Sequence, residues 1–243
     1  MDLAFECPTS LLEQVQPLAD FDWILAHKVL DDQGYAEYYR NSRRLKVLDN
    51  SCCELRYPLA LSDLAHASDL VSADLVVSPD FLGQSDSTIE ELDRALKVFG
   101  SKRLFPVAQG RNLSDVVKCA SLIQERGFTR IAIPVLRGDP LGIMAGRRSE
   151  IVEEISRRCA FNWIHLLGMT TLGEFGSYRQ LPAVKSLDTG GPVRYGMKSV
   201  FFGLQDLEDK TTPTFNLMEE ESTANLAAIY YNIAYLRKVL QKE

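Results

Sequence analysis

Short apolar segments alternate with longer amphipathic ones along the whole chain. The apolar segments are rich in β-branched and aromatic residues and show no regular polar alternation, which is typical of strands covered on both faces. They predict strands at Trp23–Leu30, Leu45–Asp49, Leu75–Ser78, Leu104–Ala108, Arg130–Leu136, Phe161–Leu167 and Val184–Asp188. We expect one more strand around Lys198–Phe202.

The amphipathic segments predict helices between these strands. Ser87–Glu91 has the pattern of a capping box, and apolar residues continue after it at helical spacing. Ser114–Arg126 predicts a helix that ends at Gly127, because glycine favours the left-handed conformation at a helix end. Ile151–Cys159 predicts another helix. The last helix covers about 220–242, with an apolar stripe of Leu226, Ile229, Tyr230, Ile233, Leu236 and Leu240.

Repeated strand–helix units imply a parallel sheet. In a chain of 243 residues they predict an α/β fold, a (β/α)₈ barrel of the TIM type, with residues 1–243 as a single domain. The C-terminal helix is expected to pack on this barrel. The stretch from Gly190 to Thr214 is rich in Gly, Pro and Thr, so we interpret it as loop around the site.

Composition narrows the class of protein. The chain is 46% hydrophobic and 25% charged, as ordinary globular proteins are. Its first residues are acidic and no apolar run is long enough to span a bilayer, so we expect a cytoplasmic protein with no membrane partner. Five cysteines without a framework spacing and three scattered histidines disfavour both disulfides and a metal site.

Charge and missing motifs limit the chemistry further. A net charge of −6 and a pI of about 5.2 weigh against non-specific binding to nucleic acid. The phosphate loop, the Gly-x-Gly-x-x-Gly dinucleotide fingerprint and the Gly-x-Ser-x-Gly elbow are absent from the sequence. The scarcity of histidine disfavours a Ser–His hydrolase. Chemistry by carboxylates and amides remains, and we expect no cofactor.

Candidate site residues follow the predicted strands. In a barrel of this kind the active site lies at the carboxyl ends of the strands. The residues at those ends are Asp49, Asp80, Gln109, Gly110, Pro134, Val135, Leu136 and Asp188. Each aspartate alone could cap a helix or form a turn, but together the strand ends favour a site. If Asp188 points inward, Ser186 shares its side of the strand and Lys185 points out, which makes Lys185 a poor Schiff-base candidate.

This ordered set resembles the tRNA-guanine transglycosylase superfamily of base-exchanging barrels. The motifs that carry the resemblance are Leu48-Asp49-Asn50-Ser51, Ser78-Pro79-Asp80, Val107-Ala108-Gln109-Gly110, Arg130-Ile131-Ala132-Ile133-Pro134, Ile164-His165-Leu166-Leu167-Gly168 and Leu187-Asp188-Thr189. The chain lacks the family's Cys-x-Cys-x-x-Cys zinc cluster and its extra RNA-binding domains, so it looks most like the compact bacteriophage branch, which inserts a 7-deazaguanine into DNA. The segment Trp23–Arg40, read as an Ala26–Leu30 strand and a tyrosine-rich helix, also looks like that branch.

The resemblance implies a role for each candidate residue. Asp188 would attack C1′ of the nucleotide as the nucleophile, and Asp49 would act as general acid and base. Asp80 would accept hydrogen bonds from the guanine edge, and Gln109 would donate to O6. Pro134 stands where the family has a glycine, so the Val135 N–H could substitute, or the pocket could suit another 7-substituent such as a nitrile. Arg147, Arg148 and Arg194 are weak candidates for contacts with the nucleic-acid backbone.

The expected function is therefore a DNA-guanine transglycosylase that exchanges guanine for a free 7-deazaguanine base such as 7-cyano-7-deazaguanine. Its location would be the host cytoplasm if a phage encodes it, and a helper protein or a homo-oligomer could present the DNA. A target inside a duplex would have to be flipped out. Three alternatives stay open: the same chemistry on tRNA, a non-catalytic barrel subunit, and an unrelated barrel enzyme that acts on a small molecule.

Overall fold

The computed structural model describes residues 1–135, 148–168, 176–178, 180–204 and 224–241. Within these residues the strands form two parallel four-stranded sheets. One sheet has the order β1 (Asp2–Phe5), β8 (Val184–Thr189), β7 (Trp163–Leu166), β6 (Arg130–Ile133). The other has the order β2 (Asp22–Leu25), β3 (Lys46–Asp49), β4 (Leu75–Val77), β5 (Leu104–Phe105).

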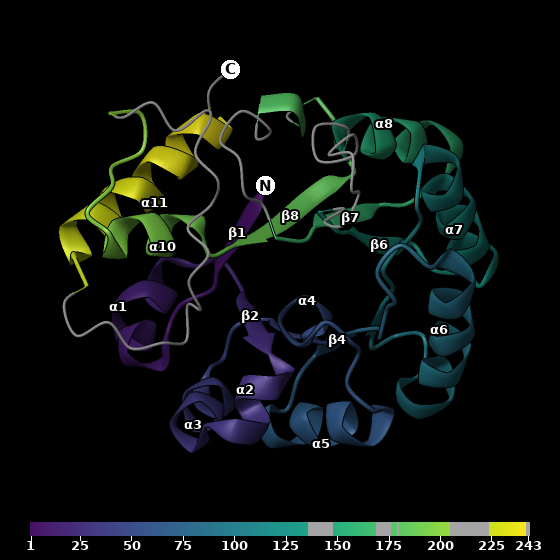
Figure 1. The fold of residues 1–243 in the computed structure, drawn as a ribbon, viewed down its shortest axis with the longest axis horizontal. Coiled ribbons are helices and arrows are strands. Elements are labelled where there is room, and N and C mark those ends of the chain that lie inside the picture. The colour runs from purple at the N-terminus through teal and green to yellow at the C-terminus, as the bar shows by residue number, and fades with distance from the viewer. Residues whose placement is uncertain (136–147, 169–175, 179, 205–223, 242–243) are drawn as a thin grey trace.

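Helices surround the strands, as Figure 1 shows, and α4 lies inside their ring, close to the strands. They are α1 (Leu12–Val15), α2 (Ala26–Asp31), α3 (Gln33–Asn41), α4 (Cys52–Leu55), α5 (Leu61–Val71), α6 (Ser85–Phe99), α7 (Leu113–Glu125), α8 (Arg148–Arg158), α10 (Gly191–Met197) and α11 (Leu226–Gln241). Short 3₁₀ turns cover Thr9–Leu11, Gln16–Leu18 and Gly176–Tyr178. None of the described helices is both long and apolar enough to cross a membrane.

The buried side chains form two clusters. The larger one fills the space between strands and helices. The smaller one lies among the strands and takes residues from both sheets, including Ala4 of β1, Trp23 of β2, Phe105 of β5 and Ala132 of β6. The inner faces of the two sheets therefore pack against each other, and the carboxyl ends of their strands come together.

Backbone hydrogen bonds also join the two sheets. On one side, the N–H of Asp20, two residues before β2, donates to the carbonyl of Leu3 in β1 at 2.8 Å. On the other, the Ala132 N–H donates to the Pro106 carbonyl at 2.8 Å, and the Ala108 N–H donates to the Ala132 carbonyl at 3.0 Å. Val107 and Ala132 form a parallel bridge there. The segment just after β5 therefore pairs in parallel with β6 of the other sheet.

The predicted strands Leu104–Ala108 and Arg130–Leu136 are shorter than expected and end at Phe105 and Ile133, and two further strand predictions contain larger errors. The predicted strand Trp23–Leu30 ends at Leu25, and Ala26–Leu30 lies in helix α2, where Ala26 and Val29 are buried at helical spacing. An unbroken apolar run does not distinguish the two structures. Lys198–Phe202 contains no strand, since it turns at Ser199 with φ of 56°. The eighth strand is instead β1 at the N-terminus, which we had not predicted.

Several helix predictions also need correction. The predicted capping box at Ser87 lies inside α6, which begins at Ser85. The predicted loop Gly190–Thr214 contains α10, and its residues from 205 onward lie outside the described residues. In α11, Tyr230 is 42% exposed and so is not part of the buried stripe. The predicted end of α7 is confirmed, because Gly127 has φ of 84° and its N–H donates to the Gln124 carbonyl at 2.8 Å.

Candidate functional site

Four carboxyl groups meet at the carboxyl ends of the strands: Glu6, Asp49, Glu54 and Asp188. Burial raises the pKa of Asp49 well above its usual range, and the negative charges of Glu54 and Asp188 raise it further. Although Glu54 as a whole residue is exposed, shielding of its carboxyl group from water, followed by the charge of Glu6, raises its pKa to about 7. Among the described residues, no group of histidine, cysteine or acidic side chains is arranged to hold a metal ion.

Glu6 is the member of this cluster that the sequence analysis missed. It directly follows β1, and it hydrogen-bonds the carboxyl group of Asp188 on the neighbouring strand β8. The signal was present in the sequence, because Leu3-Ala4-Phe5 is a short apolar run that ends in a carboxylate, as Lys46–Asp49 does. The run is short and N-terminal, so we had not counted it as a strand.

Asp188 is 1% exposed and tightly held. Its Oδ1 accepts hydrogen bonds from the Gly168 N–H and from His165 Nε2, each at 3.0 Å. Gly168 has φ of 60°, a conformation that glycine adopts without steric cost, and this turn directs its N–H at the carboxylate. Burial raises the pKa of Asp188 to about 6, while the hydrogen bonds from Gly168 and Glu6 act in the opposite direction.

A hydrogen-bonded chain lies behind Asp188. Ser186 Oγ lies 2.8 Å from His165 Nδ1, and Trp163 Nε1 donates to the same Oγ at 2.7 Å. As predicted, Ser186 and Asp188 are both on the inner side of β8 and Lys185 is exposed. Ser186, His165 and Asp188 have the residue types of a hydrolase triad, but the serine is at the buried end. It lies two residues, about 7 Å, further from the strand end than Asp188. This order favours Asp188 over Ser186 as the reacting group.

Asp49 is fixed by the turn that follows β3. Ser51 has φ of 59°, an unfavourable conformation for a residue with a side chain, and its N–H donates to Asp49 Oδ2 at 3.1 Å. The Ser51 hydroxyl accepts a hydrogen bond from the His27 N–H at 3.2 Å. Strained backbone of this kind concentrates at functional sites. The turn holds Asp49 at the strand end, where its pKa responds to the charge of Asp188.

Asp80 and Gln109 lie together, with Asn50 as a third member that the sequence analysis had not singled out. Asn50 Nδ2 donates to Asp80 Oδ1 at 2.7 Å, and Gln109 Nε2 donates to Asp80 Oδ2. Gln109 Oε1 accepts from the Gly83 N–H at 3.0 Å. Burial raises the pKa of Asp80, and the two amide donors lower it. Each carboxylate oxygen keeps a second lone pair that can accept a further hydrogen bond.

The other predicted base-binding residues fall near these strand ends. Gly110 packs against the start of α7, where an added Cβ would lie 2.6 Å from the Val116 nitrogen. Pro134 directly follows β6 and is buried, and Val135 after it is half-buried. Leu136 lies outside the described residues. Whether Gly110, Pro134 and Val135 contact a base stays a prediction.

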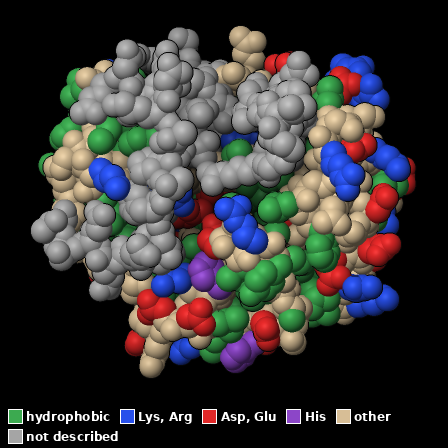
Figure 2. Space-filling view, in the orientation of Figure 1, with side chains coloured by type: hydrophobic (Ala, Val, Ile, Leu, Met, Phe, Trp, Pro, Cys, Tyr) green, Lys and Arg blue, Asp and Glu red, His purple; other side chains and the backbone are tan. Residues whose placement is uncertain are grey.

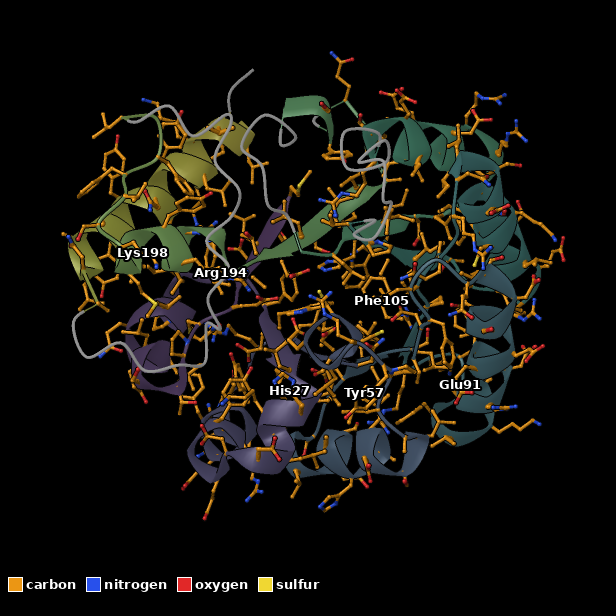
Figure 3. All side chains as sticks on the ribbon, in the orientation of Figure 1. His27, Tyr57, Glu91, Phe105, Arg194 and Lys198 are labelled. Carbon is orange, nitrogen blue, oxygen red and sulfur yellow. The ribbon has the colours of Figure 1, made fainter. Side chains whose placement is uncertain are left out.

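The three arginines differ in their surroundings. Arg194 of α10 approaches Glu6 at 3.6 Å and lies at the edge of the central strands (Figure 3). Arg148 is 2% exposed, and its guanidinium donates to the Leu167 and Ile133 carbonyls at the ends of β7 and β6. That position favours a structural role over contact with a polymer backbone. Arg147 lies outside the described residues.

The surface around the site carries both charges. Figure 2 shows acidic and basic side chains together near the centre of the face that carries these strand ends. Below them Tyr57, 60% exposed, and His27 lie near each other in the view of Figure 3, and Phe105 lies inside the ring of helices. The region offers both charged groups and an exposed aromatic ring.

Comparison with known proteins gives no family assignment. No family model matches the chain, and no curated protein matches it. The resemblance to the transglycosylase superfamily therefore rests on the sequence motifs alone.

Proposed function

We propose that this chain is a base-exchanging transglycosylase that replaces guanine in DNA with a 7-deazaguanine such as 7-cyano-7-deazaguanine. The observation that carries the proposal is the pair Asp188 and Asp49. They end strands of the two different sheets, and the pKa of Asp49 responds to the charge of Asp188. A retaining double displacement needs two such carboxyl groups with different protonation states.

The scaffold we propose for this site is a closed (β/α)₈ barrel. Its support is the inner cluster, in which Trp23 and Phe105 of one sheet pack with Ala4 and Ala132 of the other. A barrel interior is filled by side chains from all its strands in this way. The backbone hydrogen bonds of Asp20 with Leu3 and of Ala132 with Pro106 lie between the two sheets, and they support closure as well.

The protonation states favour the assigned roles. With a pKa of about 6, Asp188 is ionised at neutral pH, and its donors Gly168 and His165 hold it in place. Burial, followed by the charges of Glu54 and Asp188, raises the pKa of Asp49 well above the usual range, which favours its protonated form. Asp188 thus suits a nucleophile, and Asp49 suits a general acid.

The reaction then proceeds in two displacements. A carboxylate oxygen of Asp188 forms a bond to C1′ of the deoxyribose, and the bond from C1′ to N9 of guanine breaks. The electron pair leaves with guanine, which takes the proton of Asp49. In the second step Asp49 removes the N9 proton of the incoming base, and N9 attacks C1′. The Asp188 carboxylate is released unchanged.

Asp80 and Gln109 are proposed to select guanine. A carboxylate accepts from both N1–H and the 2-amino group of guanine, and an amide N–H can donate to O6. Adenine would leave these buried groups without correct partners, which is costly enough to discriminate. The hydrogen bonds from Asn50 and Gln109 support this role because they fix the orientation of the Asp80 carboxylate.

Two other substrates remain as alternatives. tRNA would use the same chemistry. A small molecule in an unrelated barrel reaction is favoured by the net charge of −6 and by the burial of Arg148, which removes one candidate for phosphate contact. Tyr57, which is 60% exposed two residues after α4, favours a polymer, because an exposed aromatic ring can stack on a base.

Incorporation of a labelled base tests the proposal. The protein is incubated with guanine-containing DNA or tRNA and 7-cyano-7-deazaguanine, and the digested polymer is analysed by mass spectrometry. We expect incorporation into DNA that disappears in Asp188→Asn and Asp49→Asn but persists in Asp69→Asn, an exposed aspartate of α5. Incorporation into tRNA alone would overturn the substrate. Modification of neither polymer would favour a small-molecule enzyme.

A further inference from the structure

His165 is a buried side chain in contact with Asp188 to which we have not yet given a role. It is 0% exposed, and its two ring nitrogens contact Ser186 on one side and Asp188 on the other. A register shift between β7 and β8 at Ile164/His165 brings Ser186 directly opposite His165. Irregularities of this kind often redirect side chains next to active sites.

The direction of the hydrogen bonds follows from the chemistry of the groups. The indole N–H of Trp163 can only donate, so Ser186 Oγ accepts from it. The Ser186 hydroxyl proton is then available for His165 Nδ1, at 2.8 Å. With Nδ1 as the acceptor, the proton of a neutral imidazole resides on Nε2, which donates to Asp188 Oδ1. The protons of these three hydrogen bonds, from Trp163 through Ser186 and His165, are therefore all directed toward the Asp188 carboxylate.

His165 stays neutral in this position. Burial, followed by the positive charge of Arg148, lowers its pKa to about 3. The contact with Asp188 is therefore a hydrogen bond from a neutral ring to a carboxylate, with no proton transfer between them. Because His165 keeps one proton over the working pH range, its effect on Asp188 is constant.

Aromatic neighbours hold the ring in this orientation. The indole of Trp23 stacks on His165 at 4.4 Å with an interplanar angle of 15°. The rings of Phe21 and Phe105 lie at 6.0 Å and 5.7 Å on other sides. An imidazole packed in this way cannot turn freely, so Nε2 remains directed at Asp188. Supporting contacts of this kind preserve the geometry of a reacting group.

Asp188 needs such support because its surroundings oppose its ionised form. Burial is the main cause, and charged groups lie on several elements around it. These groups are Glu6 after β1, Asp49 of β3, Glu54 of α4, Arg148 of α8, and Arg194 of α10 through its contact with Glu6. Two donors, His165 and the Gly168 N–H, share Oδ1 and favour the anion.

We propose that His165 is a positioning residue for Asp188. Its tautomer is set by Ser186 and Trp163, and its Nε2–H orients the carboxylate and keeps it ionised as the nucleophile. The statement that Asp188 is the nucleophile rests on the proposed function. The effect of the Nε2–H on the protonation of Asp188 does not, and it can be measured without any substrate.

Two substitutions at one position separate the hydrogen bond from the packing. In His165→Gln the amide nitrogen can take the place of Nε2, and in His165→Leu the donor is lost at a comparable volume. The side-chain carboxyl carbon of Asp188 is followed by ¹³C NMR as a function of pH in both variants. We expect its titration midpoint to rise by about one to two units in His165→Leu and to remain near the wild-type value in His165→Gln.

A third variant covers the case in which His165→Leu does not fold. Ser186→Ala leaves the imidazole in place but removes the group that sets its tautomer, so the midpoint should rise by a smaller amount. The inference would be overturned if the titration midpoint of Asp188 were the same in the wild type, in His165→Gln and in each of His165→Leu and Ser186→Ala that folds. A raised midpoint in a protein that modifies no polymer would support the hydrogen bond to Asp188 and overturn the proposed function alone.

Discussion

Glu6 directly follows β1, Asp188 is the penultimate residue of the neighbouring parallel strand β8, and the carboxyl groups of the two are joined by a hydrogen bond. Glu6 also raises the pKa of Glu54 and contacts Arg194 at 3.6 Å. It therefore links the acidic residues on one side of the site to Arg194.

Replacement of Glu6 tests this link. Glu6→Gln removes a negative charge next to Glu54, so the pKa of Glu54 should fall below its value of about 7. The side-chain carboxyl signal of Glu54 in a ¹³C NMR titration measures the change. Glu125→Gln, at the exposed end of α7, is the matched control and should leave that midpoint in place. An unchanged Glu54 midpoint in Glu6→Gln would show that Glu6 is too distant to act.

Stability should depend on pH through Asp188. Its folded-state pKa is raised from 3.8 to about 6, so its contribution to stability is complete below about pH 4 and is lost as the pH rises through 6. The change in the free energy of unfolding that Asp188→Asn causes should therefore be more favourable at pH 8 than at pH 4 by about 2–3 kcal/mol. Urea unfolding at both pH values measures the difference. Asp69→Asn should show the same effect at both, and equal behaviour of the two variants would refute the prediction.

Gly110 should be intolerant of a side chain. In Gly110→Ala the new Cβ would lie 2.6 Å from the Val116 nitrogen and 2.7 Å from Asp115 Cβ. We expect a loss of about 1–3 kcal/mol in the free energy of unfolding, because α7 must move. Gly34→Ala in α3 is the control, since its Cβ would meet no atom closer than 3.4 Å. Equal unfolding midpoints for the two variants would contradict the close approach.

Asp80 should control affinity for the guanine base. Asp80→Asn replaces an acceptor with a donor at one oxygen position, so we expect binding of free guanine to weaken about tenfold or more. Equilibrium dialysis against labelled guanine measures it, with Asp69→Asn as the control. Undiminished binding in Asp80→Asn would remove Asp80 from the base pocket.

The sequence predicted much of the scaffold because strand and loop signals are local. Apolar runs located β3 to β8, and the polar residues at their ends or shortly after them supplied the candidates Asp49, Asp80, Gln109 and Asp188. It failed for β1, whose run is short, and for Ala26–Leu30, where an apolar run is compatible with both strand and helix. The pairing of these strands into two sheets is a non-local property that no single segment records.

The contacts that tune the site were not predictable. His165 carries no spacing signal, and its partnership with Ser186 depends on the register shift between β7 and β8. Asn50 follows the predicted Asp49, but its bond to Asp80 requires β3 and β4 to be adjacent. Chain order indicated which residues end strands, and only the three-dimensional arrangement indicated which of them hold one another.

The central claim is that Asp188 forms a covalent bond to the sugar. The most direct measurement is an acid quench of the protein with guanine-containing DNA in the absence of an incoming base, followed by proteolysis and mass spectrometry. We predict a DNA-linked peptide whose adduct maps to Asp188 and is absent from Asp188→Asn. An adduct on another residue, or base exchange that continues in Asp188→Asn, would contradict the account.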